Sequence, residues 1–282
     1  MKWDPANIVA FLKRPMHSRD QYTCKAGSKS ITGRRNNNED RCFVNPHRGL
    51  FIVADGVGGH RGGEVASQIL VNTLPGYLHA ELDREDVTVV QDSVRTGVEA
   101  ARDRMCKFQE EYPVYNSMST TMAVALVHDE TLYVSHVGDS RIYLYSNGQL
   151  HRLTSDQTFV QAMVDAGVIT EEQVPKHPMR NIVLNLVGVK PMDQLPSVSR
   201  IPVQSGDRIL LATDGLTEVV NDSTIAEILS GKQAPQAIAN RLVETATQLG
   251  TKDNVTCVVV DLVAVHEKSD EPLPDVFALA AG

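Results

Sequence analysis

The sequence predicts an α+β fold in which helices are layered on the outside of antiparallel β-sheets. Segments with the composition of strands occur in runs, and short turns such as VHDETL and VGDSR join neighbouring segments, which favours antiparallel pairing. Long helical patterns occur in pairs between these runs, a grouping typical of α+β proteins. With 282 residues, of which 42% are hydrophobic, the chain is long enough to bury a large core.

The predicted elements follow one another in a simple order. Residues 1–24 form an N-terminal extension, and residues 25–265 contain the strands and helices of one domain. Segments rich in Val, Ile, Leu, Thr or Tyr predict strands over 41–44, 50–54, 120–128, 131–137, 141–145, 208–213 and 254–263. Apolar residues at helical spacing predict helices over 63–80, 86–111 and 234–249, and Gly250 ends the last one. Residues 266–282 are expected to be a flexible tail.

One internal segment, about 154–190, breaks this pattern into short pieces. TSDQTFVQAMVDAG reads as a capped helix that ends at Gly167, and Thr170 and Gln173 form a capping box that is followed at once by Pro175. Two turns of helix and a proline do not build a core. We therefore interpret 154–190 as a semi-independent insert over an edge of the domain, where lids and selectivity loops tend to lie.

Composition and charge restrict the class of partner. The formal net charge is −8 and no block of Lys or Arg exceeds two residues, so we expect no nonspecific binding to nucleic acid or to an anionic membrane. The four cysteines are far apart and form no CxxC pair, which favours reduced thiols. The N-terminal apolar run is too short for a signal peptide, and no apolar stretch reaches 18 residues. We expect a cytoplasmic monomer.

The stretch FIVADGVGGHRGGEVAS, residues 51–67, ends an apolar strand on a carboxylate, Asp55. Asp-Gly is also a common hairpin turn, which would explain the acid as a purely local feature. A hairpin would be followed by a second strand, whereas Ala66, Ile69 and Leu70 continue at helical spacing. The turn is therefore predicted to join a strand to a helix, a position at which functional side chains are often placed.

Further acidic residues stand at the ends of predicted strands. Asp214 repeats the Asp-Gly pattern in LLATDGL, Asp253 precedes the last strand, Asp139 lies between two strands, and Glu39 and Asp40 precede another. Any one of them could be a local turn or strand-end residue. If they converge, like charges at that density cost several kcal/mol or become protonated, so a cation is expected among them. Mg²⁺ or Mn²⁺ suits oxygen ligands, whereas zinc would require His or Cys.

A basic residue close to these acids could bind a phosphate group at the predicted site. Arg35 precedes Glu39 by four positions in RRNNNED. A planar guanidinium can hold two phosphate oxygens, which the acids alone would repel. The alternative is a surface arginine in a polar loop. A site with two or three divalent cations and an arginine is suited to phosphoryl transfer to water.

Eight segments, taken in order, resemble the bacterial form of the metal-dependent protein phosphatases of the PPM class, the phosphatase 2C family. The segments are RRNNNED, VADGVGGHRGGEVAS, MSTTMAVALV, VGDSRIYLY, LTSDQTFV, HPMRNIVLNLVG, LLATDGL and KDNVTCVVV. The resemblance runs from about Gly33 to Val263. It implies two antiparallel sheets sandwiched between pairs of helices, an αββα arrangement, with the insert at 154–190 as the flap that shapes substrate access.

The resemblance also implies roles for the site residues. The implied cations are two tightly bound Mn²⁺ or Mg²⁺ ions and a third, weaker one, and the implied nucleophile is a hydroxide that bridges the first two and attacks phosphorus in line. The implied ligands and partners are Asp55 as a bridge, Asp214 and Asp253 at one ion, Glu39 and the Gly56 carbonyl at the other, Asp139 with Asp214 at the third, Asp40 holding water, and Arg35 holding the substrate phosphate.

One position departs from part of the family. Animal members carry a histidine directly after the Asp-Gly pair, as a proposed general acid, whereas this chain has Val57. A metal-bound water is then the first candidate for protonating the leaving group, with His60 second.

These features predict a Mn²⁺- or Mg²⁺-dependent hydrolase of phosphoserine and phosphothreonine in proteins. The expected partners are phosphoproteins, including a serine/threonine kinase or its targets. Two alternatives share the fold: a pseudophosphatase that binds phosphoproteins without turnover, and a phosphatase of small phosphoesters. The first should have lost metal ligands, which this chain retains, and only substrate tests separate the second.

Overall fold

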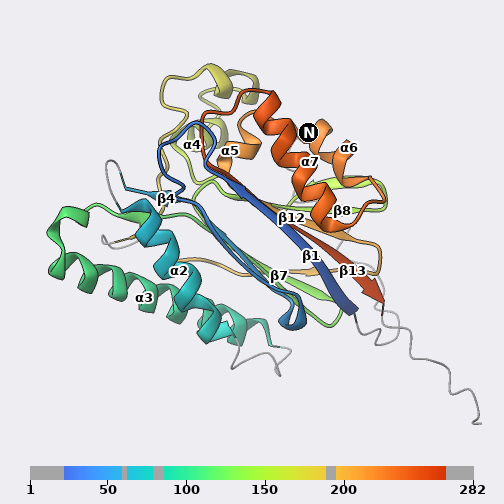
Figure 1. Cartoon of the computed structure of the whole chain (residues 1–282), viewed down its shortest axis with the longest axis horizontal. Coiled ribbons are helices and arrows are strands. Elements are labelled where there is room, and N and C mark those ends of the chain that lie inside the picture. Colours follow the sequence, from blue (N-terminus) through green and yellow to red (C-terminus); the bar gives the residue numbers. More distant parts are fainter. Residues whose placement is uncertain (1–21, 59–61, 79–85, 189–194, 265–282) are drawn as a thin grey trace, which may run out of the picture.

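The structure, a computed structural model, describes residues 22–58, 62–78, 86–188 and 195–264. Two five-stranded antiparallel sheets pack face to face, and helices cover the outer face of each sheet (Figure 1). The predicted α+β fold with sheets between helix pairs is confirmed. Most of the predicted extension, His60 and the predicted tail at 266–282 lie outside the described residues.

The first sheet has the strand order β1-β13-β12-β8-β9. Its strands are β1 (Tyr22–Ile31), β8 (Arg141–Ser146), β9 (Gln149–Arg152), β12 (Arg208–Ala212) and β13 (Val255–Ala264). All five residues of β12 are buried because the strand is covered on both faces. Ile209 and Leu211 pack between the two sheets, and Leu210 and Ala212 pack against the outer helices, as the alternation of side chains along a strand requires.

The second sheet has the order β11-β7-β6-β3-β2. A small three-stranded sheet has the order β10-β5-β4; in the chain, β4 follows β3 and β5 precedes β6. The strands of the second sheet are β2 (Arg41–Asn45), β3 (Leu50–Ala54), β6 (Met122–His128), β7 (Thr131–Val137) and β11 (Ser199–Pro202). The small sheet consists of β4 (Gly56–Val57), β5 (Ser119–Thr120) and β10 (Val187–Gly188). Asp55 separates β3 from β4, and Thr121 separates β5 from β6.

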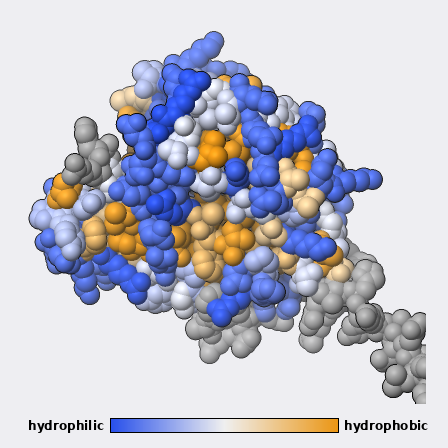
Figure 2. Space-filling view, viewed as in Figure 1, coloured by the Kyte–Doolittle hydropathy of each residue, from blue (hydrophilic) through white to orange (hydrophobic). Residues whose placement is uncertain are grey.

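Helices close the outer faces of both sheets. The pair α2 (Gly63–Leu78) and α3 (Val87–Glu111) covers the second sheet, and α5 (Asp214–Thr217), α6 (Asp222–Leu229) and α7 (Pro235–Gln248) cover the first. Three apolar layers result, one between the sheets and one under each helix group. Figure 2 shows a mainly hydrophilic face with smaller hydrophobic patches, in keeping with sheets whose apolar faces are covered. Within the described residues, no helix is both long and apolar enough to span a bilayer.

The insert contains α4 (Phe159–Asp165) and the 3₁₀ helix η3 (Glu171–Lys176). The 3₁₀ helix begins with the predicted Thr170 and Gln173 capping box. Backbone hydrogen bonds from Phe159 N to Ile182 O and from Leu184 N to Gln157 O, each 2.8 Å long, join the two ends of the insert. The remaining 3₁₀ helices are η1 (Pro46–Arg48) and η2 (Pro113–Tyr115). The end of the predicted insert, 189–190, lies outside the described residues.

Several elements differ from the sequence prediction. Tyr22–Cys24, assigned to the extension, belong to β1, an edge strand whose exposed polar residues hide its strand character. The predicted strand 120–128 is two strands, because Thr121 leaves the ladder to hydrogen bond with Asp55. The sequence analysis also missed α6, which is only eight residues long.

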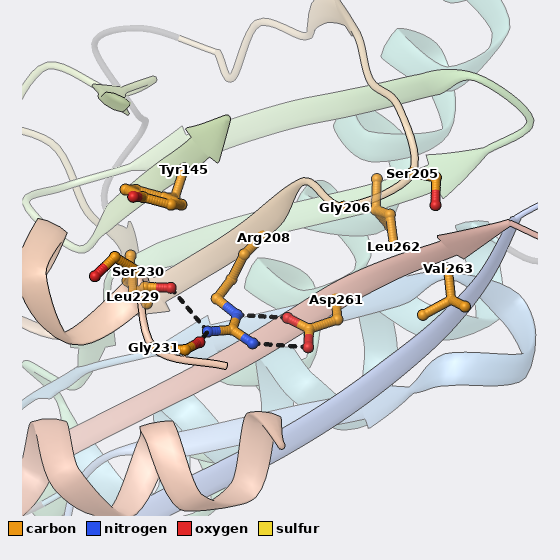
Figure 3. Close-up of a pocket in the computed structure, with 10 residues that line it drawn as sticks. All are labelled: Tyr145, Ser205, Gly206, Arg208, Leu229, Ser230, Gly231, Asp261, Leu262 and Val263. Carbon is orange, nitrogen blue, oxygen red and sulfur yellow. Dashed lines mark hydrogen bonds and ion pairs between the residues drawn. The ribbon is translucent and has the colours of Figure 1, made fainter. Parts of the chain in front are cut away.

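A pocket of about 320 Å³ opens beside Arg208, at the end of β12 remote from Asp214. The Arg208 guanidinium forms a bidentate pair with Asp261 and donates to the carbonyls of Leu229 and Gly231 (Figure 3). It also donates to the carbonyl of Gln233. All five N–H groups of this arginine are used. The pair therefore holds the end of α6 and the following turn onto the first sheet.

Candidate active site

The predicted acidic residues come from the ends of strands in both sheets. Asp55 follows β3, Asp214 follows β12 by one residue, and Asp253 precedes β13. Asp139 lies in the turn between β7 of the second sheet and β8 of the first. We call Glu39, Asp40, Asp55, Asp139, Asp214 and Asp253 the acid cluster.

The electrostatics of the acid cluster show that its carboxylates lie close together. Burial raises the pKa of Asp55 well above its ordinary value, and the charges of Asp40 and Asp214 add to the rise. Burial also raises the pKa of Asp214, together with the charges of Asp139 and Asp253. The Asp55 and Asp214 carboxyl groups are within hydrogen-bonding reach of each other. Such pKa shifts mean that the carboxylates repel one another and are short of positive charge.

Hydrogen bonds at the junction of the second sheet and the small sheet fix the backbone of Asp55. Its N–H donates to Thr121 Oγ1 at 2.9 Å, and its carbonyl accepts from Thr121 N and from Thr120 Oγ1, both at 2.8 Å. The same Thr121 hydroxyl is 2.7 Å from Ser140 Oγ, next to Asp139. The break between β5 and β6 therefore holds two members of the acid cluster in place.

Asp40 is the most buried member of the acid cluster, with 2% of its surface exposed. Its Oδ2 accepts from Thr213 Oγ1 at 2.9 Å, while its Oδ1 is buried with no hydrogen-bond partner in the described protein. Burial raises the pKa of Asp40 to about 7. Asp214 Oδ1 is likewise buried and without a partner. Buried acceptors without donors are costly, so both oxygens suit a cation or ordered water.

Glu39 and the Gly56 carbonyl, predicted to serve one ion, are brought together around Gly63. A Cβ atom on Gly63 would lie 2.2 Å from Glu39 Oε2 and 2.6 Å from Gly56 O. Ser67 Oγ of α2 donates to the Glu39 carbonyl. Only a glycine at the start of α2 allows this close approach. The sequence analysis identified the turn that joins this strand to a helix but not the role of Gly63.

Arg35 contacts the acid cluster directly. Its Nη2 is 2.6 Å from Asp253 Oδ2, and 59% of the Arg35 side chain is exposed. The guanidinium therefore reaches the edge of the cluster and still faces solvent, from which a phosphate would arrive. The structure thus brings Arg35 to the acid cluster, and its role with the substrate phosphate stays a prediction.

Two residues that the sequence analysis missed also shape the site. Asn254 Oδ1 accepts from Glu39 N, and Asn254 Nδ2 donates to Thr32 O and Asn37 O, all at 2.8 Å, which holds the Arg35 loop against β13. Glu218, just after α5, has its pKa raised by burial, although Arg180 of the insert lowers it. Their positions in the sequence could have indicated both residues, since Asn254 directly follows Asp253 and Glu218 comes four residues after Asp214.

The acid cluster fits a hard divalent cation by its chemistry. No three His, Cys, Asp or Glu side chains in the described parts of the chain already surround one point as metal ligands. The donors are nonetheless all carboxylate or carbonyl oxygens, two of them lack any other partner, and the carboxylates mutually raise their pKa values. Mg²⁺ and Mn²⁺ prefer such oxygen donors.

Substituting Gly63 by alanine tests the close approach at the start of α2. We expect Gly63→Ala to displace Glu39 and to lower any metal-dependent activity about 100-fold, the usual effect of a displacement of 1 Å in an active site. Gly76→Ala in the same helix is the control, because a Cβ there meets nothing within 4 Å. It should stabilise the protein by about 0.5–1 kcal/mol and leave activity unchanged. Equal activity of both variants in a steady-state assay would contradict the assignment.

The sequence matches known proteins over most of its length. The profile of the family described as Protein phosphatase 2C matches residues 28–253. The serine/threonine protein phosphatase PstP of Mycobacterium tuberculosis is 36% identical over 239 residues, which cover 85% of this chain and 45% of PstP. Protein phosphatase PhpP of Streptococcus pneumoniae is 32% identical over 243 residues, which cover 84% of this chain and 96% of PhpP. The chain thus spans less than half the length of PstP.

Solved structures show the same likeness. The crystal structure of the M. tuberculosis serine/threonine phosphatase PstP/Ppp aligns with a TM-score of 0.78 and 35% identity, covering 86% of this chain and 99% of that one. The catalytic domain of PstP in complex with two manganese ions aligns with a TM-score of 0.75 and 34% identity, covering 86% of this chain and 100% of that one.

Proposed function

This chain belongs to the protein phosphatase 2C family, and from that membership we propose that it hydrolyses phosphoserine and phosphothreonine in proteins, with Mn²⁺ or Mg²⁺ as cofactor. The observation that carries the proposal is the acid cluster, with carboxylates from both sheets and two buried oxygens that lack a donor. PstP, a serine/threonine phosphatase with the same fold, has been crystallised with two manganese ions.

Each member of the acid cluster has a proposed role. Asp55 bridges two cations, with Asp214 and Asp253 at one of them and Glu39 and the Gly56 carbonyl at the other. Asp139 joins Asp214 at a third, weaker site. The bound cations would neutralise the cluster, activate water as Lewis acids and stabilise the charge that develops on phosphorus.

The remaining steps belong to side chains of the protein. Arg35 binds the phosphate oxygens of the substrate and orients phosphorus toward the acid cluster, since its guanidinium already reaches Asp253 and faces solvent. Asp40, whose Oδ2 accepts from Thr213 Oγ1, would hold a water molecule beside the cations. Val57 has no proton to give and takes no part in leaving-group protonation.

The proposed substrates are phosphoproteins, among them a serine/threonine kinase or the proteins that it phosphorylates. We further propose that the protein acts as a cytoplasmic monomer, with a catalytic domain that begins with β1 at Tyr22 and extends to about residue 265, and with 154–190 as a flap over the site. The names of two relatives support the substrate class, since PstP and PhpP are both called protein phosphatases. If the purified protein dephosphorylated no autophosphorylated kinase from its own cell, the kinase part of this proposal would fail.

The direct test is release of phosphate from a phosphothreonine peptide by the purified protein with Mn²⁺, with EDTA, and with Mn²⁺ after Asp214→Asn. A phosphotyrosine peptide and a small aryl phosphate run beside it. The proposal expects rapid turnover of the phosphothreonine peptide that both EDTA and the substitution abolish. Binding of Mn²⁺ and of the peptide without turnover would instead favour a phosphoprotein-binding module. Preference for the small phosphoester would favour a phosphatase of small molecules.

Replacing Arg35 tests its role with the phosphate. We expect Arg35→Ala to raise the KM for the phosphothreonine peptide about 10–100-fold, the value of a lost charge-assisted hydrogen bond of about 1.5–3 kcal/mol. Arg34→Ala is the matched control, because Arg34 is an exposed neighbour in the same loop. A KM that changes equally in both variants would show only a general loss of positive charge.

A further inference from the structure

A second cluster of charges lies just beside the acid cluster. Asp156, near the start of the insert, forms a bidentate ion pair with Arg141, with Nη2–Oδ2 at 2.7 Å and Nε–Oδ1 at 3.0 Å. Arg152 Nη2 also donates to Asp156 Oδ1. The Arg141 and Asp156 side chains are only 21% and 13% exposed. The roles proposed so far use none of these three residues.

Arg141 stands close in the chain to a member of the acid cluster. Asp139 lies in the turn two positions before Arg141, so their Cα atoms are at most about 7 Å apart, a separation that an arginine side chain can span. Ser140, between them, contacts Thr121. Both charges of the ion pair act on the Asp139 carboxyl: burial raises the pKa of Asp139 to about 6, the Asp156 charge adds to the rise, and the Arg141 charge lowers it. A free Arg141 side chain could therefore reach Asp139.

A guanidinium and a divalent cation cannot use the same carboxylate lone pairs at once. Arg141 bound to Asp139 would compete with the cation that Asp139 is proposed to hold. In the structure Arg141 is instead turned to Asp156, and its Nη1 donates to Tyr143 OH at 3.2 Å. Tyr143 OH in turn donates to Asp222 Oδ1 at 3.0 Å.

We propose that Asp156 is a positioning residue that keeps Arg141 paired and so leaves the Asp139 carboxylate available to a divalent cation. The inference rests on the proposed function, because it assigns Asp139 to a cation. The loop itself has separate support. Gly138 N donates to Gln157 Oε1 at 2.8 Å, and Gln157 N donates to Gly138 O at 3.0 Å. Loss of the Asp156 charge therefore changes the partner of Arg141 more than it changes the loop.

The two partners of one ion pair are expected to have opposite effects. In Asp156→Asn, Arg141 loses its partner and can pair with Asp139. The weakest Mn²⁺ site should then lose about 10-fold in affinity. Losses of this size are common when a residue that orients a metal ligand is removed. In Arg141→Met the competitor is gone, so Mn²⁺ should bind as tightly as in the wild type or more tightly. If the pair only stiffened the site, both substitutions would weaken binding alike.

The experiment is a Mn²⁺ titration of metal-free protein, with free Mn²⁺ measured by electron paramagnetic resonance and no substrate present. Asp261→Asn is the matched control, because the Arg208–Asp261 pair is also bidentate and lies at the remote end of β12 (Figure 3). It should lower the melting temperature without changing the Mn²⁺ isotherm. Asp156→Glu keeps the charge and should restore much of the affinity.

The outcomes separate the inference from the proposed function. Weaker Mn²⁺ binding in Asp156→Asn but not in Arg141→Met supports the inference. Equal weakening in both variants, or an unchanged isotherm in Asp156→Asn, overturns it while the proposed function stands. A wild-type protein that binds no Mn²⁺ overturns both. If Asp156→Asn does not fold, Arg141→Met alone still decides, because weaker binding in that variant contradicts the inference.

Discussion

Asp55→Asn should abolish phosphatase activity and at the same time stabilise the metal-free protein. Asp55 is proposed to bridge two cations, and loss of several kcal/mol of transition-state stabilisation corresponds to a fall of about 10³-fold or more in kcat. Without metal, the same substitution removes one of several carboxylates that raise one another's pKa values, and so removes part of the repulsion between them. The melting temperature in EDTA should then rise by about 2–4 °C, the equivalent of about 1 kcal/mol for a domain of this size.

Three measurements check this expectation. Steady-state hydrolysis of the phosphothreonine peptide reports the loss of activity, and thermal unfolding in EDTA and in Mn²⁺ reports the two stabilities. Mn²⁺ should stabilise the wild type and should have a much smaller effect on Asp55→Asn. Asp103→Asn is the control, because the Asp103 side chain is 66% exposed on α3 and should change neither quantity. Retention of activity in Asp55→Asn would remove the central ligand from the proposed site.

Arg208→Met should produce the largest loss of stability outside the active site. Arg208 is 8% exposed, and its removal leaves the Asp261 carboxylate and the carbonyls of Leu229 and Gly231 without donors. Removing one partner of a buried pair costs about 3–5 kcal/mol. Because 23% of the Asp261 side chain is exposed and water can reach it, we expect the lower value, about 3 kcal/mol.

Urea unfolding of Arg208→Met measures this loss, and Arg200→Met is its control because Arg200 is exposed on the edge strand β11. The kcat/KM of the folded variant should stay within about twofold of the wild type, since Arg208 lies at the end of β12 remote from the acid cluster. A loss of less than about 1 kcal/mol would show that the released carbonyls find water.

The sequence predicted those features that depend on local patterns. Asp55 and Asp214 each end a strongly apolar strand and precede a glycine, so both the strand and the acid at its end are visible in a few residues. The long helices α2, α3 and α7 were predicted to within a few residues, because their apolar spacing extends over several turns. The resemblance to a family then assigned roles to the acids.

Other features depend on contacts that no short segment contains. The sequence of β1 looks polar because β1 is the outermost strand of its sheet and several of its side chains are exposed. It forms a strand because it pairs with β13, which is far away in the sequence. Gly63 matters only because folding brings Glu39 and Gly56 against the start of α2. Asn254 could be predicted as a neighbour of Asp253, but its three hydrogen bonds to the Arg35 loop cross most of the chain.

The order of the strands has a consequence for synthesis of the protein. The N-terminal strand β1 and the interior strand β12 both pair with β13, the last described strand, so the first sheet lacks its connecting strand until that segment has left the ribosome. Arg35 and Asp253 are 218 positions apart in the chain and meet only then. Such distant contacts slow folding, and an unfinished chain leaves strand edges and apolar surface open to other chains. A nascent chain that lacks β13 is therefore expected to be without an assembled acid cluster and prone to aggregate.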